Sequence, residues 1–231
     1  MTTVVITGAG RGLGLALARQ HLTEGATVVG GCRNPSRAQE LVSAGAEVLP
    51  LDTGSGESIA AFGKALADRP VDVLYNNAGI DARAVGAEDG SRSALDLTEA
   101  QFRAVMDVNV IGPLLMVQAL VDNLRRANGT IVNVSSQVGS IEVAQSIGRD
   151  VSYNSSKAAL NMLTLKQSQV LRADGVTVIA LHPGWVRSDM GGPTATLDPA
   201  ESAAGIVALV NRLAIDETGS FFQWDGSIHP W

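Results

Sequence analysis

Seven short runs rich in valine and isoleucine alternate with helical stretches along this chain, and few folds are open to such a pattern. The runs predict strands at TVVIT, ATVVGG, AEVLPL, VDVLYNNA, GTIVNVSS, GVTVIALHPG and SFFQWDG. A 3.6-residue periodicity predicts helices at about 13–24, 36–44, 57–68, 98–127, 153–172 and 199–213. The runs lack polar alternation, which is typical of strands buried on both faces. The alternation therefore predicts an α/β fold with a mainly parallel sheet covered by helices on both sides.

The chain reads as a single domain. No linker rich in proline, glycine or serine divides the 231 residues, and no repeat of fixed period is present, so we expect one doubly wound domain over residues 1–231. Hydrophobic residues make up 45% and charged residues 17%, which is typical of a folded globular protein rather than a disordered one. Ligands of doubly wound sheets bind at the carboxyl ends of the strands, so functional residues are expected there.

Charge and composition argue against several classes of function. The formal net charge is -6, whereas nucleic-acid binding needs clustered lysine and arginine. Cys32 is the only cysteine, and His21, His182 and His229 are scattered, so no disulfide and no metal site is expected. The amino terminus enters an apolar strand without a leader-like segment, and no run reaches the 18 or so uninterrupted apolar residues of a membrane span. We expect a soluble cytoplasmic protein without a membrane partner.

A glycine-rich turn, TGAGRGLG, follows the first predicted strand. Gly8, Gly12 and Gly14, with Gly10 as an extra glycine, depart from the strict G-x-G-x-x-G fingerprint because Leu13 takes its sixth position. Glycines at these places still let the backbone turn tightly and let a pyrophosphate approach the amino end of the following helix. A tight strand-to-helix turn with no ligand is the alternative interpretation.

The end of the second predicted strand, GGCRNP, indicates which dinucleotide this turn would bind. An acidic residue here would bind the ribose hydroxyls of NAD, but Cys32 takes that position and Arg33 follows. Arg33 and Arg11 offer two guanidinium groups to a phosphate, so NADP(H) is favoured over NAD(H). A solvated loop charge is the alternative for Arg33.

Tyr153 and Lys157, in DVSYNSSKAALNML, are four residues apart on a predicted helix. This spacing puts the phenol and the ammonium on one helix face. An ordinary surface pair has the same spacing, so the two residues indicate a site only together with the rest of the chain.

Five motifs in order resemble those of the short-chain dehydrogenase/reductase family. TGAGRGLG is similar to its T-G-x-x-x-G-x-G turn, NNAG to its second signature and YNSSK to its Y-x-x-x-K, while NVSS and the PG of HPGW follow in the expected order. The resemblance covers nearly the whole chain. SSQVGSI, ALNML, HPGWVRSDMGG and the final HPW are most similar to the C-factor and sniffer-like carbonyl reductase branch. The resemblance to this family implies a Rossmann fold with a mainly parallel seven-stranded sheet.

The resemblance implies a catalytic set. Tyr153 would be the acid–base group, and the Lys157 ammonium would favour its phenolate and bind the nicotinamide ribose. Ser136 would hydrogen-bond the substrate carbonyl. Ser135 is the rival, but the family's serine usually stands three residues before the glycine of SSQVG, and Ser135 would instead satisfy backbone groups at the strand end.

Asn109 completes this set. It lies in a helical stretch, and Pro113, four residues on, has no N–H to give to the Asn109 carbonyl. A water is the natural replacement, and the family's proton relay has one there, linked to the lysine. The alternative is that Pro113 only kinks the helix for packing.

The resemblance also implies how the cofactor is held. Asp52 would accept a hydrogen bond from the adenine amino group, with Thr53 adding a contact, and helix capping is the alternative for Asp52. His182 is expected to be structural. The cofactor-binding residues would be Gly8, Gly10, Arg11, Gly12, Leu13, Gly14, Arg33, Asn34, Asp52, Thr53, Asn77, Ala78, Gly79, Tyr153, Lys157, Pro183, Gly184, Val186 and Ser188.

The leading hypothesis is an NADP-dependent reductase of ketones or aldehydes that works reversibly. A catalytically silent NADP-binding regulatory or signalling protein is the alternative, and a lyase-type relative is a third. Such lyases tend to lose the glycine turn or replace the lysine by arginine, and this chain keeps both. A homodimer or homotetramer is expected because the family commonly forms them.

The predicted pocket lining favours a hydrophobic carbonyl substrate. It mixes apolar and small residues at Gln137, Val138, Ile141, Val143, Trp185, Met190 and the loop through Leu197. The stretch EVAQSIGRD before Tyr153 is longer than is common in the family, and we expect it to loop near the site and shape it. The charged residues from Asp81 to Asp96 are either a solvated loop or a lid edge, and the loop is favoured.

Overall fold

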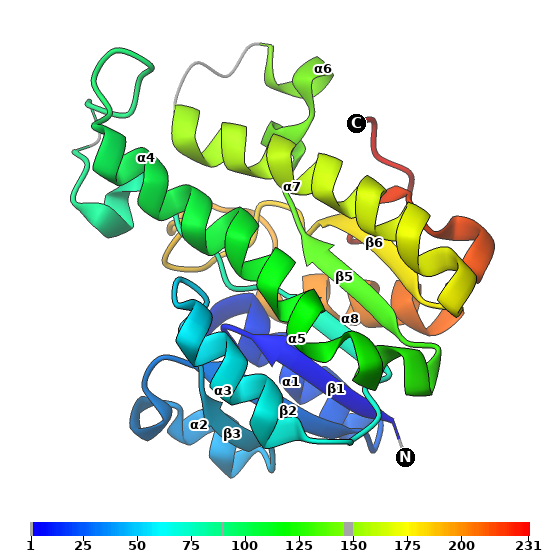
Figure 1. Ribbon diagram of the computed structural model, residues 1–231. Helices are drawn as coiled ribbons and strands as arrows, with labels where there is room; N and C mark the ends of the chain where they lie inside the picture. Colours follow the sequence, from blue (N-terminus) through cyan, green and yellow to red (C-terminus); the bar gives the residue numbers. More distant parts are fainter. Residues whose placement is uncertain (1, 89, 146–149) are drawn as a thin grey trace.

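The computed structural model describes residues 2–88, 90–145 and 150–231, and its strands form one seven-stranded sheet (Figure 1). The strands are β1 (Thr3–Thr7), β2 (Thr27–Cys32), β3 (Glu47–Pro50), β4 (Val73–Asn76), β5 (Thr130–Val134), β6 (Thr177–His182) and β7 (Phe221–Gln223). Each pair of neighbours is parallel, in the order β3-β2-β1-β4-β5-β6-β7. The predicted seven-stranded doubly wound sheet is confirmed. The order reverses between β1 and β4, where such sheets open a crevice for ligands.

Helices cover both faces of this sheet (Figure 1). They are α1 (Gly12–Thr23), α2 (Gln39–Ser43), α3 (Gly56–Leu66), α4 (Glu99–Met106), α5 (Gly112–Ala127), α6 (Ile141–Ala144), α7 (Val151–Leu171) and α8 (Pro199–Arg212). Short 3₁₀ turns are η1 (Pro35–Arg37), η2 (Ala82–Val85), η4 (Gln137–Gly139), η5 (Arg172–Asp174) and η6 (Ile215–Glu217). Side chains of α1, α2 and α8 share one hydrophobic core with the sheet, and those of α3, α5 and the end of α7 share the other.

Strand β1 shows why the strands read as continuous apolar runs. Val4 and Ile6 are buried in the core beneath α1 and α8, whereas Val5 is buried in the core beneath α3 and α5. Successive side chains of a strand point to opposite faces, so a strand with a core on each side needs apolar residues at every position. Burying each of these side chains stabilises the fold by about 1.5–3 kcal/mol.

The predicted helix at 36–44 is wrong in part. The chain first makes the 3₁₀ turn Pro35–Arg37, and α2 begins only at Gln39. Between them Ala38 has φ -97° and ψ 37°, outside the helical region, and its side chain is buried in the core that α1 and α8 share with the sheet. This backbone at Ala38 interrupts the helix that the local sequence favours.

The predicted helix at 98–127 is interrupted by a π-helical turn, η3 (Asp107–Ile111), between α4 and α5. The N–H of Gly112 donates to the carbonyl of Asp107, five residues back, directly before Pro113. A π turn is a natural response to a proline that cannot donate in the α-helical register. The turn contains Asn109, which is completely buried.

The same long helix, Glu99–Ala127, is the one described segment that is long and apolar enough to cross a membrane by length and composition, with a mean hydropathy of 1.8. Core helices pass the same test. Met116, Leu120 and Leu124 of α5 are buried against the sheet and α3, which is the packing of a core helix.

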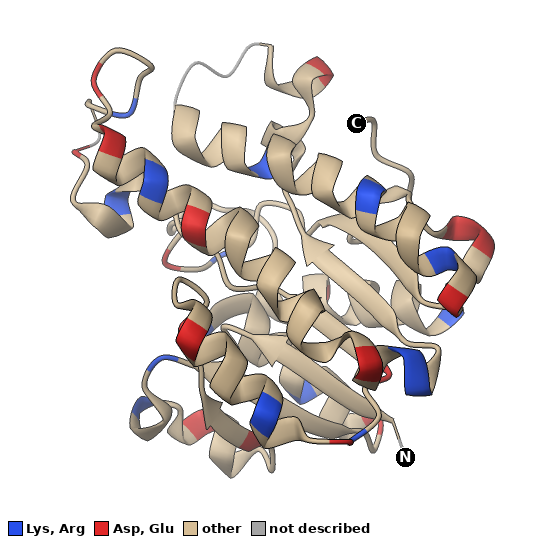
Figure 2. Ribbon diagram, viewed as in Figure 1, with Lys and Arg blue, Asp and Glu red and all other residues tan. Residues whose placement is uncertain are grey.

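Charged residues lie mainly on the outer helices and loops, where blue and red segments are interspersed in the view of Figure 2. Ion pairs such as Arg19–Glu40 and Arg103–Glu99 leave both side chains more than half exposed. Water and salt screen pairs of this kind, so they contribute little to stability.

Candidate active site

The glycine turn after β1 is shaped by close approaches of backbone. Gly8 has φ 68°, and a Cβ at Gly14 would lie 2.4 Å from the carbonyl oxygen of Gly8 and 2.7 Å from Nδ2 of Asn77. Helix α1 starts directly behind this turn, and its N-cap residue, Arg11, makes no side-chain cap. The first N–H groups of α1 are therefore open to an anion.

Replacing Gly14 by alanine is expected to lower the free energy of unfolding by about 1–3 kcal/mol, because the added carbon overlaps backbone that cannot move freely. Urea denaturation measures this change. Gly10→Ala is the matched control: its added carbon would lie 3.7 Å from Cβ of Cys32, an ordinary contact. Equal stability of the two variants would contradict the close packing seen at Gly14.

The ends of β1 and β4 are joined by a small polar network. The Thr7 hydroxyl accepts hydrogen bonds from the N–H groups of Asn77 (3.0 Å) and Ala78 (2.9 Å). The Asn77 amide donates to the carbonyls of Thr7 (2.9 Å) and Gly8 (3.3 Å). Asn77 therefore holds the glycine turn, and Thr7, which the sequence analysis did not single out, organises both strand ends.

Asn109 lies at the centre of a second network. Its Oδ1 accepts from the N–H of Ile80 (2.9 Å), and its Nδ2 donates to the carbonyl of Ile80 (2.8 Å) and to the Ser156 hydroxyl (2.9 Å). Ser156 in turn donates to the carbonyl of Tyr153 (2.7 Å). Ser156, which the sequence left unassigned, thus links the π turn to α7.

Gly79 marks where the separate parts of the site meet. A Cβ placed on it would lie 3.4 Å from Oδ1 of Asn109 and 3.6 Å from Nζ of Lys157. The end of β4, the π turn and α7 therefore converge beside this glycine. The predicted residues Asn109 and Lys157, 48 positions apart in the chain, are neighbours here.

Tyr153, Lys157 and Ser136 form one cluster. The Ser136 hydroxyl lies close enough to the Tyr153 phenol to lower the pKa of that phenol. Nζ of Lys157 lies 5.5 Å from the centre of the Tyr153 ring and donates to the carbonyl of Val134 (2.7 Å). Ser135 turns away and donates to Oδ1 of Asn161 (2.5 Å). Of the two serines that the sequence offered, Ser136 is the one in contact with the tyrosine.

Burial dominates the ionisation of this cluster. It raises the pKa of the Tyr153 phenol above its usual 10; the Ser136 hydroxyl opposes this, while the Asp81 and Asp150 carboxylates add to it. Burial lowers the pKa of Lys157 to about 8. Burial is thus the largest influence on the pKa of each group, and the Lys157 ammonium is bonded to a backbone carbonyl.

The loop after β6 closes against the glycine turn. Gly184, after Pro183, has φ 81°, and Val186 pairs with Leu197 across the loop. Ser188 accepts from the N–H of Gly191 (3.2 Å), and its Cβ lies 3.5 Å from where a Cβ on Gly12 would stand. The loop after the HPGW segment and the glycine turn thus lie next to each other.

The two arginines predicted to face a phosphate differ in their surroundings. Arg11 forms an ion pair with Asp189 of the loop after β6. Arg33 and Asn34 follow β2 and are exposed, and no ion pair joins Arg33 to any residue that the structure describes. Of the two arginines, Arg33, at the end of β2, is therefore the one without an ion pair among the described residues.

Asp52 is exposed at the end of β3, with Thr53 buried beside it. Its Oδ1 accepts from the N–H of Gly54 (3.0 Å), whereas the cap of α3 is Ser55, which accepts from the N–H of Ser58. The capping alternative for Asp52 is therefore wrong. His182 is buried and packs its ring 5.6 Å from that of His229, which fits a structural residue.

The solvated-loop interpretation of the segment from Asp81 to Asp96 is wrong for two of its residues. Asp81 is buried and binds the Arg83 guanidinium, which also donates to the carbonyl of Met190 (2.8 Å). Arg92 is buried and forms an ion pair with Asp150. Only short-range charge patterns are visible in a sequence, and nothing in this one signals a pair 58 residues apart.

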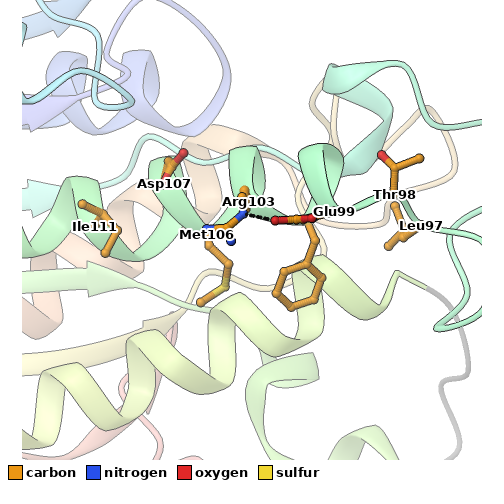
Figure 3. Close-up of a pocket in the computed structure, with 8 residues that line it drawn as sticks. Leu97, Thr98, Glu99, Arg103, Met106, Asp107 and Ile111 are labelled. Atoms are coloured by element: carbon orange, nitrogen blue, oxygen red, sulfur yellow. Dashed lines mark hydrogen bonds and ion pairs between the residues drawn. The ribbon is translucent and has the colours of Figure 1, made fainter.

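A groove runs along α4 (Figure 3). Its lining residues are Leu97, Thr98, Glu99, Phe102, Arg103, Met106, Asp107 and Ile111. Met106 points from α4 toward α7, while Glu99 and Arg103 pair along the rim (2.7 Å). None of the proposed catalytic residues lines this groove.

The glycine turn and the strand ends beside it have features that suit a dinucleotide. Gly8 and Gly14 leave no room for side chains where the turn approaches the uncapped start of α1, and an exposed arginine stands at the end of β2. N–H groups at a helix start and a guanidinium are the donors that phosphates prefer.

The segment 142–150 before Tyr153 was predicted to loop near the site. Of this segment, residues 146–149 lie outside the described residues.

Known proteins share both the sequence pattern and the fold. A model described as short chain dehydrogenase matches residues 2–197. C-signal of Myxococcus xanthus is 38% identical over 173 residues, which cover 74% of this chain and 99% of that protein.

Two solved structures superpose over the whole chain. The NADPH-bound carbonyl reductase from chicken fatty liver has a TM-score of 0.90 and 33% identity, and the match covers 100% of this chain and 99% of that one. Carbonyl reductase Sniffer of D. melanogaster has a TM-score of 0.90 and 29% identity, and the match covers 100% of both chains.

Proposed function

The chain belongs to the short-chain dehydrogenase family, and on that premise we propose that it is an NADP-dependent reductase of ketones or aldehydes that works reversibly. The predicted similarity to C-factor and sniffer-like proteins is confirmed, and family membership makes the chain an oxidoreductase with a small-molecule substrate. The observation that carries the finer proposal is the cluster of Ser136, Tyr153 and Lys157 at the carboxyl edge of the sheet.

The proposed chemistry is a proton transfer matched to a hydride transfer. When bound, NADPH supplies the hydride to the carbonyl carbon. The Ser136 hydroxyl donates a hydrogen bond to the carbonyl oxygen, and Tyr153 gives its phenol proton to that oxygen. Because burial raises the pKa of Tyr153, the phenol is protonated at neutral pH, as an acid for reduction must be.

Lys157 and Asn109 support this transfer in the proposal. The pKa of Lys157, lowered by burial to about 8, still leaves most of the amine charged at pH 7, and that charge favours the phenolate left after proton donation. The Asn109 backbone, in the π turn before Pro113, is proposed to hold the water through which Lys157 returns a proton to Tyr153.

The cofactor would lie along the crevice, with its pyrophosphate at Gly8, Gly12 and Gly14 and its adenine near Asp52. Exposed Arg33 is the proposed contact of the 2′-phosphate, and this supports a preference for NADP(H) over NAD(H). The NADPH named for the chicken carbonyl reductase supports the same choice.

Replacing Arg33 by alanine is expected to raise the KM for NADPH about 10- to 100-fold, because a charge-assisted hydrogen bond contributes about 1.5–3 kcal/mol. The KM for NADH should stay the same. Arg172→Ala, at an exposed arginine that follows α7, is the control. A uniform rise for both cofactors would assign Arg33 to folding rather than to cofactor choice.

The opening of the site supports an apolar substrate. Ile141, at the start of α6 after β5, and Trp185 and Met190, in the loop after β6, expose 79%, 51% and 37% of their surface. Exposed apolar side chains beside a few polar groups are typical of pockets for hydrophobic ligands. We propose a hydrophobic carbonyl compound as substrate, a cytoplasmic enzyme, and a homodimer or homotetramer that size-exclusion chromatography would resolve.

The decisive experiment is a panel of ketones and aldehydes assayed with NADPH and with NADH. Oxidation of NADPH by at least one apolar carbonyl compound, faster than oxidation of NADH, is the expected result. The 38% identity to C-signal favours one other candidate, a signalling protein that binds NADP without turnover. Tight NADPH binding with no oxidation across the panel would favour that candidate.

A further inference from the structure

A buried ion pair joins the segment before α4 to the start of α7. Arg92 is 8% exposed, and its guanidinium contacts the carboxylate of Asp150, whose side chain is 17% exposed. Isolated charges are expensive to bury, so a buried pair of opposite charges holds its two segments together once formed. Here the two segments are 58 residues apart in the chain.

The backbone reinforces the same junction. The N–H of Val151 donates to the carbonyl of Arg92 (3.1 Å), and the N–H of Asn154 donates to the carbonyl of Asp150 (2.9 Å). Asp150 precedes α7 with φ 62° and ψ 52°, and its carboxylate makes no cap on the helix. An aspartate before a helix usually caps it. Here the Asp150 carboxylate instead forms an ion pair with Arg92.

Tyr153 stands in the first turn of α7, three residues after Asp150. The Asp150 carboxylate raises the pKa of the phenol, as does that of Asp81, and each of these carboxylates is paired with an arginine, Arg92 or Arg83. Lys157 faces the same ring. The other elements packed on α7 carry His182 on β6, Glu99 and Arg103 on α4, Asp107 on η3, and Arg172 and Asp174 on η5.

We propose that the Arg92–Asp150 pair, which holds the start of α7, also sets the charge around the acid–base tyrosine, so that its two halves act on the Tyr153 phenol in opposite directions. The inference rests on the proposed role of Tyr153 as the acid–base group. Beyond holding the helix, the pair sets the local charge at the phenol: its carboxylate disfavours the phenolate and its guanidinium offsets that effect.

The two halves of the pair are expected to have opposite effects on the pH profile of alcohol oxidation, which needs the phenolate. Asp150→Asn removes a negative charge, so the rising limb of kcat/KM should move to lower pH by roughly half to one unit. Arg92→Met removes a positive charge, so the limb should move to higher pH by a similar amount. The double variant should lie near the wild type.

A merely structural pair would behave differently, because losing either partner breaks it equally. Shifts of the same sign, or lower rates with an unchanged profile, would overturn the proposal. The ion pair Arg125–Asp174, which ties α5 to η5 after the opposite end of α7, is the matched control, and Arg125→Met should leave the profile in place. If Arg92→Met fails to fold, Asp150→Asn, which is nearly isosteric, still tests the proposal by the sign of its shift in the pH profile.

A second readout does not depend on turnover. The chain has two tyrosines, Tyr75 and Tyr153, so isotope-labelled tyrosine gives two ring signals by NMR, and Tyr153→Phe identifies which is which. The Tyr153 signal should titrate at lower pH in Asp150→Asn than in the wild type. If this shift appears in a protein without reductase activity, the proposed function is wrong and the proposed role of the Arg92–Asp150 pair stands. If the shift is absent in an active enzyme, the proposed function stands and the proposed role of the pair is wrong.

Discussion

Replacing Tyr153 by phenylalanine is expected to lower kcat for carbonyl reduction with NADPH by about 100- to 10,000-fold, the usual contribution of a positioned proton donor. Phenylalanine keeps the ring and its packing but removes the hydroxyl that meets Ser136. The stability of the variant and its Kd for NADPH should therefore stay close to those of the wild type. Stopped-flow single turnovers would separate the chemical step from binding and release.

The comparison variant for this experiment is Ser135→Ala, one residue away from the proposed Ser136. Ser135 donates to Asn161 and does not contact the phenol, so its loss should reduce kcat far less than Tyr153→Phe. A Tyr153→Phe enzyme that retains more than a tenth of the wild-type rate would remove the phenol from the mechanism. A matching loss of NADPH binding would instead make Tyr153 a cofactor contact.

Acidification from pH 6.5 towards 4 is expected to destabilise the fold by about 1.4 kcal/mol per pH unit for each of two buried histidines. Burial lowers the pKa of His21 to about 4, and burial with the nearby His229 lowers that of His182 to about 4. Both stay neutral in the native state, while the unfolded chain takes up protons below about 6.5. The stability is thus present above pH 6.5 and is lost as the pH falls.

The surroundings of His21 explain why it resists protonation. Its Nε2 lies 2.9 Å from the Tyr75 hydroxyl, and both side chains are buried between α1 and β4. With a total stability of about 5–15 kcal/mol for a typical domain, two such groups remove a large part of it before pH 4. Glu24, Asp198 and Asp225 have lowered pKa values and add their own loss only at more acidic pH.

Urea denaturation at several values between pH 7 and pH 5 measures this effect, within a range above the carboxylate titrations. His182→Asn should flatten the slope of stability against pH by about half, and His21→Gln should do the same. A wild-type protein that is equally stable at pH 7 and pH 5 would show that these histidines accept protons without unfolding.

The sheet and the core of the site were predictable because they depend on local patterns. Continuous apolar runs such as TVVIT identify strands with a core on both sides, and the glycine turn and the Tyr153–Lys157 spacing are short motifs. Pro113 also signalled a disturbance around Asn109. The form of that disturbance, a π turn, was not predicted, because the backbone register depends on how both helix halves pack.

Long-range polar contacts were not predictable. Arg92 meets Asp150, Arg11 meets Asp189, and Ser156 links Asn109 to the Tyr153 backbone. Each contact depends on where loops from different strand ends meet in space. A sequence shows that these residues are polar but not which partner each will meet, and the solvated interpretation of Arg92 failed for that reason.

The π turn between α4 and α5 lets the chain hold one residue more than an even helix without changing how the two halves pack. The extra residue of Asp107–Ile111 is taken up locally, whereas the same residue in an uninterrupted α-helix would rotate one half against the other by about 100°. Helix α4 packs on α7, and α5 packs on α3 and the sheet, so neither half is able to absorb that rotation. The turn therefore keeps both packing faces in place around the buried Asn109.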